Sequence, residues 1–144
     1  MGANAPITVI YDGTPQAKAR ARFGSGHVYM PSGTVDYQHN LGWAAKAAMA
    51  GRKPLTGGAV KLTALFELPI PTSWAAARRN DAIAGLILPT GKPDLDNYVK
   101  AALDAINGIV VEDDAMVAEI RARKVYGCNP KTTVTVAPLS GARP

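Results

Sequence analysis

The sequence predicts a mixed α/β (α+β) fold in a single domain, with a central β-sheet and helices packed on it. The 144 residues suffice for one domain with a substantial core but not for two. The apolar content of 47% is typical of a globular protein. Segments with strand-like patterns alternate along the chain with segments of helical apolar spacing. We expect one domain over residues 1–144, with flexible tails at 1–5 and 138–144.

The elements follow from local patterns of apolar, turn and capping residues. Residues 59–68 are apolar on both faces, which is typical of a central strand. The apolar side chains Leu95, Tyr98, Ala102 and Ile106 repeat at helical spacing and indicate a helix with one buried stripe. Strands are predicted at 7–11, 59–68, 117–126 and 132–136, a hairpin at 18–30, and helices at 35–50, 74–84 and from 94 or 95 to Asn107-Gly108.

Composition restricts the location of the protein and the kind of metal site. No apolar run approaches the length of about 20 residues that spans a bilayer, and the N-terminus lacks a secretory pattern. We therefore expect a cytoplasmic protein that does not enter a membrane. Cys128 is the single cysteine, and His27 and His39 are the two histidines, so a disulfide framework or zinc site is not expected. Oxygen ligands, and hence Mg²⁺ or Mn²⁺, are favoured instead.

The net charge of +5 favours a polyanionic partner such as nucleic acid. Acidic residues, by contrast, are concentrated between Asp94 and Glu119. A basic surface around an acidic cluster suits an enzyme that cuts a phosphate backbone. The basic residues at 18, 20 and 22 fit a solvated strand face equally well. The candidate DNA-binding residues are Lys18, Arg20, Arg22, Arg78, Arg79, Lys92, Arg121 and Arg123.

Two pairs of carboxylates form the candidate site: Asp94 and Asp96, here called the leading pair, and Asp113 and Asp114, the trailing pair. We expect both pairs at the same end of the helix between them, because residues 109–111 can return the chain part of the way. Carboxylates that converge in this manner require a cation between them. The alternative is purely structural: aspartate favours helix caps and turns, and Lys100 would form an ordinary surface ion pair with Asp96.

The stretch Lys92-Pro93-Asp94-Leu95-Asp96-Asn97 is followed by Lys100, Asp104, Asn107-Gly108 and Asp113-Asp114. This pattern resembles the signature of the RusA family of Holliday-junction resolvases, which are crossover junction endodeoxyribonucleases. Residues 20–31 and 71–74 also look like segments of that family. The resemblance extends from about residue 15 to residue 124.

The resemblance implies that Asp94, Asp96 and Asp114 bind the metal and that Lys100 is the essential lysine. Asp113 stays an alternative ligand, and Asn97 either supports the ligands or caps the helix. The implied fold is RusA-like.

The implied activity is Mg²⁺-dependent hydrolysis, with Mn²⁺ as a possible substitute, by a homodimer without an organic cofactor. It would act on four-way junction DNA in recombination and repair, making paired symmetric nicks that leave 5′-phosphates. A bacterial or phage origin is implied too. Two other functions fit the sequence: a non-catalytic nucleic-acid-binding protein, and a metal-dependent nuclease acting on other branched or flapped DNA.

Overall fold

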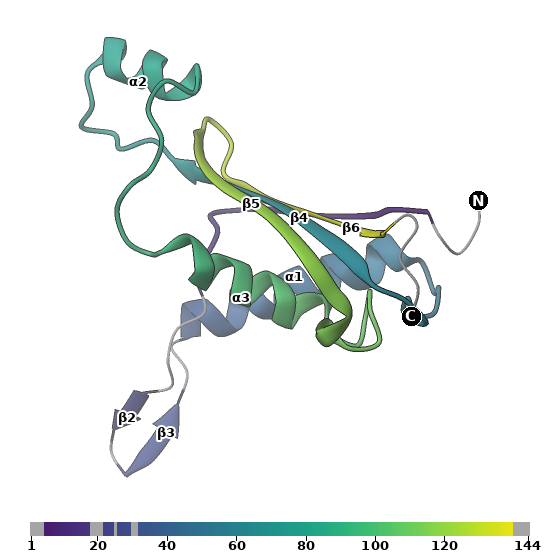
Figure 1. Cartoon of the computed structure of the whole chain (residues 1–144). Helices are drawn as coiled ribbons and strands as arrows, with labels where there is room; N and C mark the ends of the chain where they lie inside the picture. The colour runs from purple at the N-terminus through teal and green to yellow at the C-terminus, as the bar shows by residue number, and fades with distance from the viewer. Residues whose placement is uncertain (1–4, 18–21, 25, 30–31, 140–144) are drawn as a thin grey trace.

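The structure is a computed structural model that describes residues 5–17, 22–24, 26–29 and 32–139. A four-stranded mixed sheet carries helices packed on it, which confirms the predicted mixed fold in a single domain (Figure 1). The strands are β1 (Ile7–Asp12), β4 (Val60–Pro69), β5 (Val117–Gly127) and β6 (Lys131–Pro138), with a separate hairpin of β2 (Arg22–Gly24) and β3 (His27–Tyr29). The helices are α1 (Ser32–Met49), α2 (Ala76–Ile83), α3 (Leu95–Ile106) and the 3₁₀ turn η1 (Asp114–Met116).

The strand order in the sheet is β1-β6-β4-β5. Strand β4 pairs antiparallel with β6 and parallel with β5, so the prediction that residues 59–68 form a central strand is confirmed. The parallel pairing follows from α3, which carries the chain back along the sheet before β5 begins. As a result β5 is an edge strand, and its outer side faces no other strand within the described part of the chain.

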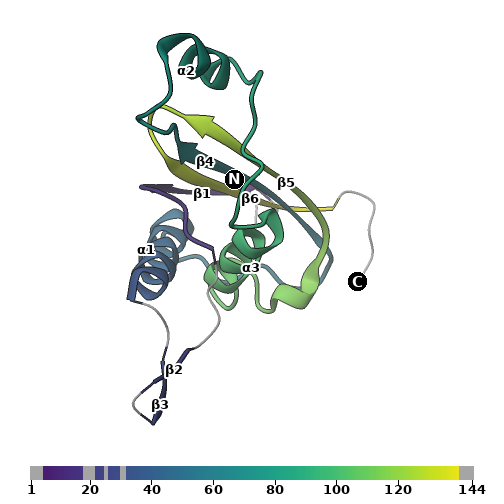
Figure 2. The same cartoon turned by 90° about the vertical axis from the view of Figure 1, so that its left-hand side faces the viewer.

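Helices α1 and α3 cover the same face of the sheet (Figure 2). The side chains of β4 on this face, from Val60 to Phe66, alternate with more exposed ones and are almost completely buried. On α3, the buried alanines allow the helix to approach the sheet closely, and the ring of Tyr98 stacks on Phe66 with 5.2 Å between centroids. The predicted apolar stripe of this helix therefore forms the core that holds α3 in place.

Helix α2 lies beyond the ends of β4 and β5 and away from the other two helices (Figure 1). It begins at Ala76 with Ala75 as an uncapped N-terminal residue, so the predicted start at Trp74 is wrong. The physical reason is that Trp74 packs edge-to-face on Tyr126 of β5, at 5.2 Å between ring centroids. The chain bends at Trp74 and is extended at Ala75, so the helix starts two residues later than predicted.

In the described residues, no helix combines the length and the apolar character needed to cross a membrane. Strand β6 extends to Pro138, the first residue of the segment expected to be a tail.

Candidate active site

The leading pair lies at the N-terminal end of α3, at the surface. Asp94 is the N-cap residue by its extended backbone (φ −68°, ψ 150°), yet its side chain forms no capping hydrogen bond. Both of its carboxylate oxygens lie 3.0 Å from the ammonium of Lys92 instead. The carboxylate of Asp94 therefore does not cap α3, as the structural alternative would require.

Asp96 lies in the first turn of α3, one turn before Lys100. Its carboxylate is 4.0 Å from the ammonium of Lys100, and both side chains are more than half exposed. An exposed ion pair of this kind stabilises a protein by no more than about 1 kcal/mol. The interaction therefore leaves both groups accessible to a ligand from solvent.

The loop in front of the leading pair is bound to the edge strand. The ammonium of Lys124 in β5 donates hydrogen bonds to the carbonyl oxygens of Gly91 and Pro93, at 2.8 and 3.1 Å. Because Pro93 immediately precedes Asp94, this contact couples the position of the leading pair to β5.

The trailing pair lies at the opposite end of α3. The backbone N–H of Asp114 donates to the side-chain oxygen of Asn107, the C-cap residue of α3, at 3.0 Å. The carboxylate of Asp113 accepts a hydrogen bond from the backbone N–H of Ala115 at 2.9 Å and so caps η1. Asp113 and Asp114 therefore differ in their contacts, because the carboxylate of Asp113 already accepts a backbone hydrogen bond.

The expectation that both pairs lie at one end of the helix is wrong for a single chain. Helix α3 has 12 residues, which corresponds to a length of about 18 Å between its ends. The chain does not return after α3 because Val110 and Val111 are fully buried at its C-terminal end. The N–H of Leu55 also donates to the carbonyl of Val110, at 2.8 Å, which fixes this turn from outside.

The separation of the two acidic pairs limits how one chain can bind a metal ion. Within residues 5–17, 22–24, 26–29 and 32–139, no three side chains of His, Cys, Asp or Glu lie close enough together to hold one metal ion. Carboxylates have the right donor chemistry for Mg²⁺. One chain, however, brings only the leading pair to one end of α3 and the trailing pair to the other.

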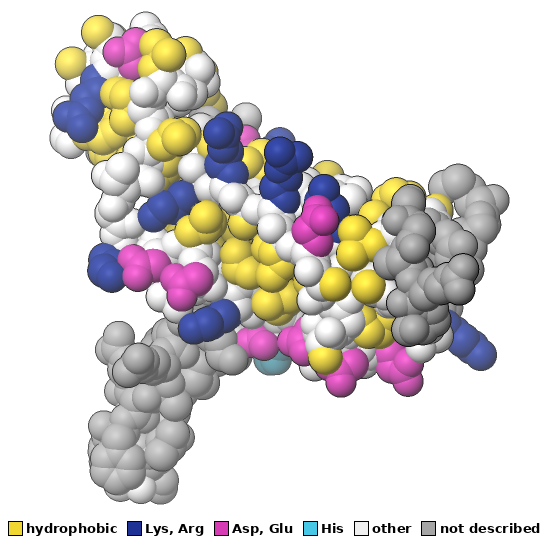
Figure 3. All heavy atoms as spheres, viewed as in Figure 1, with side chains coloured by type: hydrophobic (Ala, Val, Ile, Leu, Met, Phe, Trp, Pro, Cys, Tyr) yellow, Lys and Arg dark blue, Asp and Glu magenta, His cyan; other side chains and the backbone are white. Residues whose placement is uncertain are grey.

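The predicted basic residues fall on separate elements. On α2, the guanidinium of Arg78 stacks on the Trp74 ring, 3.9 Å from its centroid, and Arg79 donates to the carbonyl of Pro71 at 3.1 Å. Arg121 and Arg123 are exposed on β5, and dark blue side chains follow this strand in Figure 3. Lys18 and Arg20 lie outside the described residues, and Arg22 is described only in its backbone within β2.

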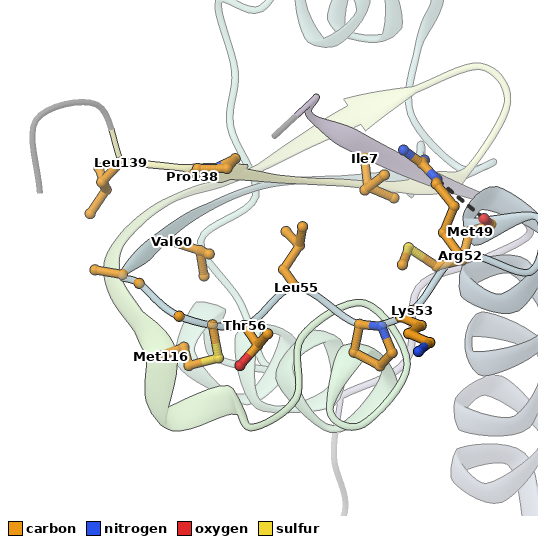
Figure 4. A pocket seen from close by; sticks show the side chains of 14 residues that line it. Ile7, Met49, Arg52, Lys53, Leu55, Thr56, Val60, Met116, Pro138 and Leu139 are labelled. Carbon is orange, nitrogen blue, oxygen red and sulfur yellow. Dashed lines mark hydrogen bonds between the residues drawn. The ribbon is translucent and has the colours of Figure 1, made fainter. Parts of the chain in front are cut away.

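A pocket lies at the end of the sheet where β4 begins and β6 ends. None of the predicted site residues lines it (Figure 4). Its lining is mainly apolar, with Ile7, Met49, Leu55 and Met116 among the contributing side chains. The side chain of Arg52 is directed back to α1, where it donates to the carbonyl of Met49 at 3.2 Å. We therefore place the candidate site on the surface around α3 and β5.

Sequence reasoning did not identify Asn107 as more than the end of a helix. Its side chain positions the backbone of Asp114, seven residues later. The Asn-Gly step predicts the end of a helix and belongs to the family-like pattern, but neither indicates a contact with Asp114.

Comparison with known proteins agrees with the resemblance seen in the motif. The model of the family described as endodeoxyribonuclease RusA matches residues 12–137, from the end of β1 into β6. The chain is also similar to an uncharacterized protein, YqaN, of Bacillus subtilis (strain 168). The identity is 28% over 136 residues, which cover 93% of this chain and 96% of YqaN.

Proposed function

Because this chain belongs to the RusA family of endodeoxyribonucleases, we propose that it is a Mg²⁺-dependent resolvase of Holliday junctions. It hydrolyses phosphodiester bonds by paired symmetric nicks that leave 5′-phosphates, in DNA recombination and repair. The observation that carries this proposal is the leading pair, because its two carboxylates are exposed at the start of α3 with Lys100 one turn away.

The ligands of the metal in this proposal are Asp94 and Asp96 of one chain and Asp114 of the second chain of a homodimer, because one chain holds them at opposite ends of α3. Among the trailing pair we favour Asp114, because the carboxylate of Asp113 already accepts a backbone hydrogen bond. When bound, Mg²⁺ would lower the pKa of a water molecule and compensate negative charge on the phosphodiester.

Two lysines complete the proposed chemistry. Lys100 faces Asp96 from the next turn of the helix, where its ammonium can stabilise the charge that develops on the phosphate. Lys92 lies beside Asp94, where it can bind a neighbouring phosphate of the same strand. Asn97, in the first turn of α3, supports the ligands in this proposal.

The basic residues serve to attract and orient the junction. Arg121 and Arg123 extend along β5, next to the site, and Arg78 lies on α2. Contacts with phosphates release counterions, so we expect junction affinity to decrease steeply with salt concentration. Lys18, Arg20, Arg22 and Arg79 belong to the same proposed DNA-binding set.

The test is a cleavage assay on a labelled four-way junction, with duplex, flap and fork substrates beside it at one salt concentration. We expect symmetric nicks in the junction with Mg²⁺ and none with a chelator, and products that a ligase can reseal because they carry 5′-phosphates. The Asp96→Asn variant should bind the junction without nicking it. Metal-independent binding with no nicking by the unmodified protein would contradict the proposal and favour a non-catalytic DNA-binding protein. Preferential cleavage of flaps or forks would favour a nuclease for other branched DNA.

A further inference from the structure

Helix α2 belongs to a segment that leaves the body of the protein and returns to it. Ile70 before the segment and Pro89 after it are buried, and residues 71–88 between them are here called the α2 arm. Within α2 only Ala82 is buried. Figures 1 and 2 show the arm beyond the end of the sheet, on the same side of the molecule as the first turn of α3. The α2 arm therefore protrudes next to the leading pair.

The base of the arm is fixed by contacts of its side chains. Trp74 packs on Tyr126 of β5, and the guanidinium of Arg78 stacks on the Trp74 ring. Arg79 donates a hydrogen bond to the carbonyl of Pro71. A helix as short as α2 is not stable on its own in water, so these contacts stabilise it. The arm is thus preformed, and a ligand does not have to order it.

The turn that ends α2 holds a leucine in solvent. The N–H of Gly85 donates to the carbonyl of Ala82 at 3.1 Å, and the N–H of Leu86 donates to that of Asp81 at 2.9 Å. These two bonds, with Gly85 at a φ of 81°, form a Schellman motif. A hydrophobic residue in the place of Leu86 usually packs on the residues that are Asn80 and Asp81 here. Because both are polar, Leu86 has no apolar partner on the helix and is 76% exposed.

Two further apolar side chains are exposed beside Leu86. They are Ile83, at 52%, and Leu88, at 40%, and the three residues are here called the apolar tip. The apolar tip contains three of the six large apolar side chains that are exposed in the described part of the chain. In Figure 3 the arm is at the upper left, where apolar side chains lie beside basic ones. Single exposed leucines are common, but a group of them marks a surface that binds another molecule.

We propose that the apolar tip stacks on the faces of DNA bases that a branch point exposes. The α2 arm would in this way distinguish branched DNA from intact duplex. This inference rests on the proposed function and adds to it the residues that select the substrate.

The charge and the position of the arm favour DNA as the ligand. The segment 70–93 has three basic residues, Arg78, Arg79 and Lys92, and one acidic residue. Leu86 precedes Asp94 by eight residues, which span no more than about 28 Å even when fully extended. A DNA strand bound at the leading pair therefore lies within reach of the apolar tip.

The chemistry of the tip favours bases over phosphates. Leucine and isoleucine gain free energy by burying apolar surface and offer nothing to a phosphate oxygen. An intact duplex covers the faces of its bases by stacking, whereas the stack is interrupted at a branch point. Proteins that bend DNA insert leucine and isoleucine side chains between base steps in the same manner. The tip should therefore add affinity for a junction only, while the basic residues add affinity for any duplex.

Binding titrations without cleavage test this selectivity. In the presence of a chelator, we expect the double variant Ile83→Ser/Leu86→Ser to bind a four-way junction at least about tenfold more weakly. Its affinity for a duplex of the same length should change by less than about twofold, because phosphate contacts dominate there. The matched control is Ile10→Ser, which alters an isoleucine that is 54% exposed on β1 and should change neither affinity. An unchanged junction affinity, or an equal loss on both DNAs, would overturn the inference.

Fluorescence tests the stacking itself. 2-Aminopurine, an adenine analogue that brightens when it is unstacked, is placed next to the branch point. We expect brightening with the unmodified protein and with Leu86→Phe, which keeps an apolar side chain, but not with the double variant. Thermal unfolding checks that the double variant is folded. A folded double variant that changes its oligomeric state in sedimentation would overturn the inference, because the tip would then join copies of the chain.

The two proposals can fail separately. If the unmodified protein never nicks the junction with Mg²⁺ but brightens 2-aminopurine through the tip, the proposed function is contradicted and the stacking is supported. If it nicks the junction normally and the brightening is the same with the double variant, the stacking is overturned and the proposed function is not affected.

Discussion

The two ends of α3 carry the same type of side chain in different surroundings. At the N-terminal end, the carboxylates of the leading pair are more than half exposed and form ion pairs with the lysines at 92 and 100. At the C-terminal end, Asn107 and Ala115 hold the backbone and side chain of the trailing pair by hydrogen bonds. The first end is a pair of accessible acids on a helix, and the second is an acidic turn built into the fold. The leading pair is therefore accessible to a ligand from solvent, whereas the trailing pair is fixed by the turn that carries it.

The largest effect should come from removing one acid at each end. We expect Asp96→Asn and Asp114→Asn each to reduce junction nicking by at least about 100-fold, because each removes a proposed metal ligand. Both residues lie at the surface, so thermal unfolding should hardly change. Asp81→Asn, which alters an exposed acid on α2, is the matched control and should nick normally. Full activity of Asp114→Asn together with loss of activity in Asp113→Asn would transfer the ligand role to Asp113.

The core between α1 and the sheet should respond to alkaline pH. The hydroxyl of Tyr37 on α1 forms a buried hydrogen bond of 2.6 Å with Thr132, and burial raises the pKa of Tyr37 to about 12. Since this pKa is raised on folding, its contribution is complete below pH 10 and is lost as the pH rises from 10 to 12. We expect a loss of about 2–3 kcal/mol in the free energy of unfolding over that interval. Tyr37→Phe should have a flatter dependence, measured by urea unfolding at each pH.

A smaller effect is expected from loosening only the C-terminal end. Asn107→Ala removes the acceptor of the Asp114 backbone N–H and should lower the free energy of unfolding by about 1 kcal/mol. Nicking should decrease by about tenfold, because Asp114 would no longer be held in position. Asn80→Ala, which alters an exposed asparagine on α2, is the comparison variant and should nick normally. Equal stability and activity of Asn107→Ala and the original protein would show that the hydrogen bond does not position Asp114.

The smallest effect should follow from removing Lys92. This lysine pairs with Asp94 at 3.0 Å, but its side chain is 85% exposed, so Lys92→Met should leave unfolding in urea almost unchanged. Junction affinity should decrease modestly and its salt dependence should become shallower, since one phosphate contact is lost. A steeper salt dependence in binding titrations would contradict a contact between Lys92 and DNA.

Local sequence patterns determined much of this protein. The spacing of Leu95, Tyr98 and Ile106 predicted α3 and its buried face, because helical periodicity acts within a few turns. The apolar run at 59–68 predicted β4 as a central strand, and the scarcity of histidine and cysteine indicated oxygen ligands. These properties depend on residues that are close in sequence, which is why they could be read without the fold.

Tertiary structure alone decided where the acidic pairs lie relative to each other. The turn after α3 is held by hydrogen bonds between Leu55 and the segment that includes Val110 and Glu112, more than 50 residues later. The late start of α2 has a similar cause, because Trp74 packs on Tyr126 of a distant strand. Burial and pairing between segments far apart in the chain leave no local periodicity. The sequence by itself therefore determined which residues could form a site, and only the fold determined that one chain separates them.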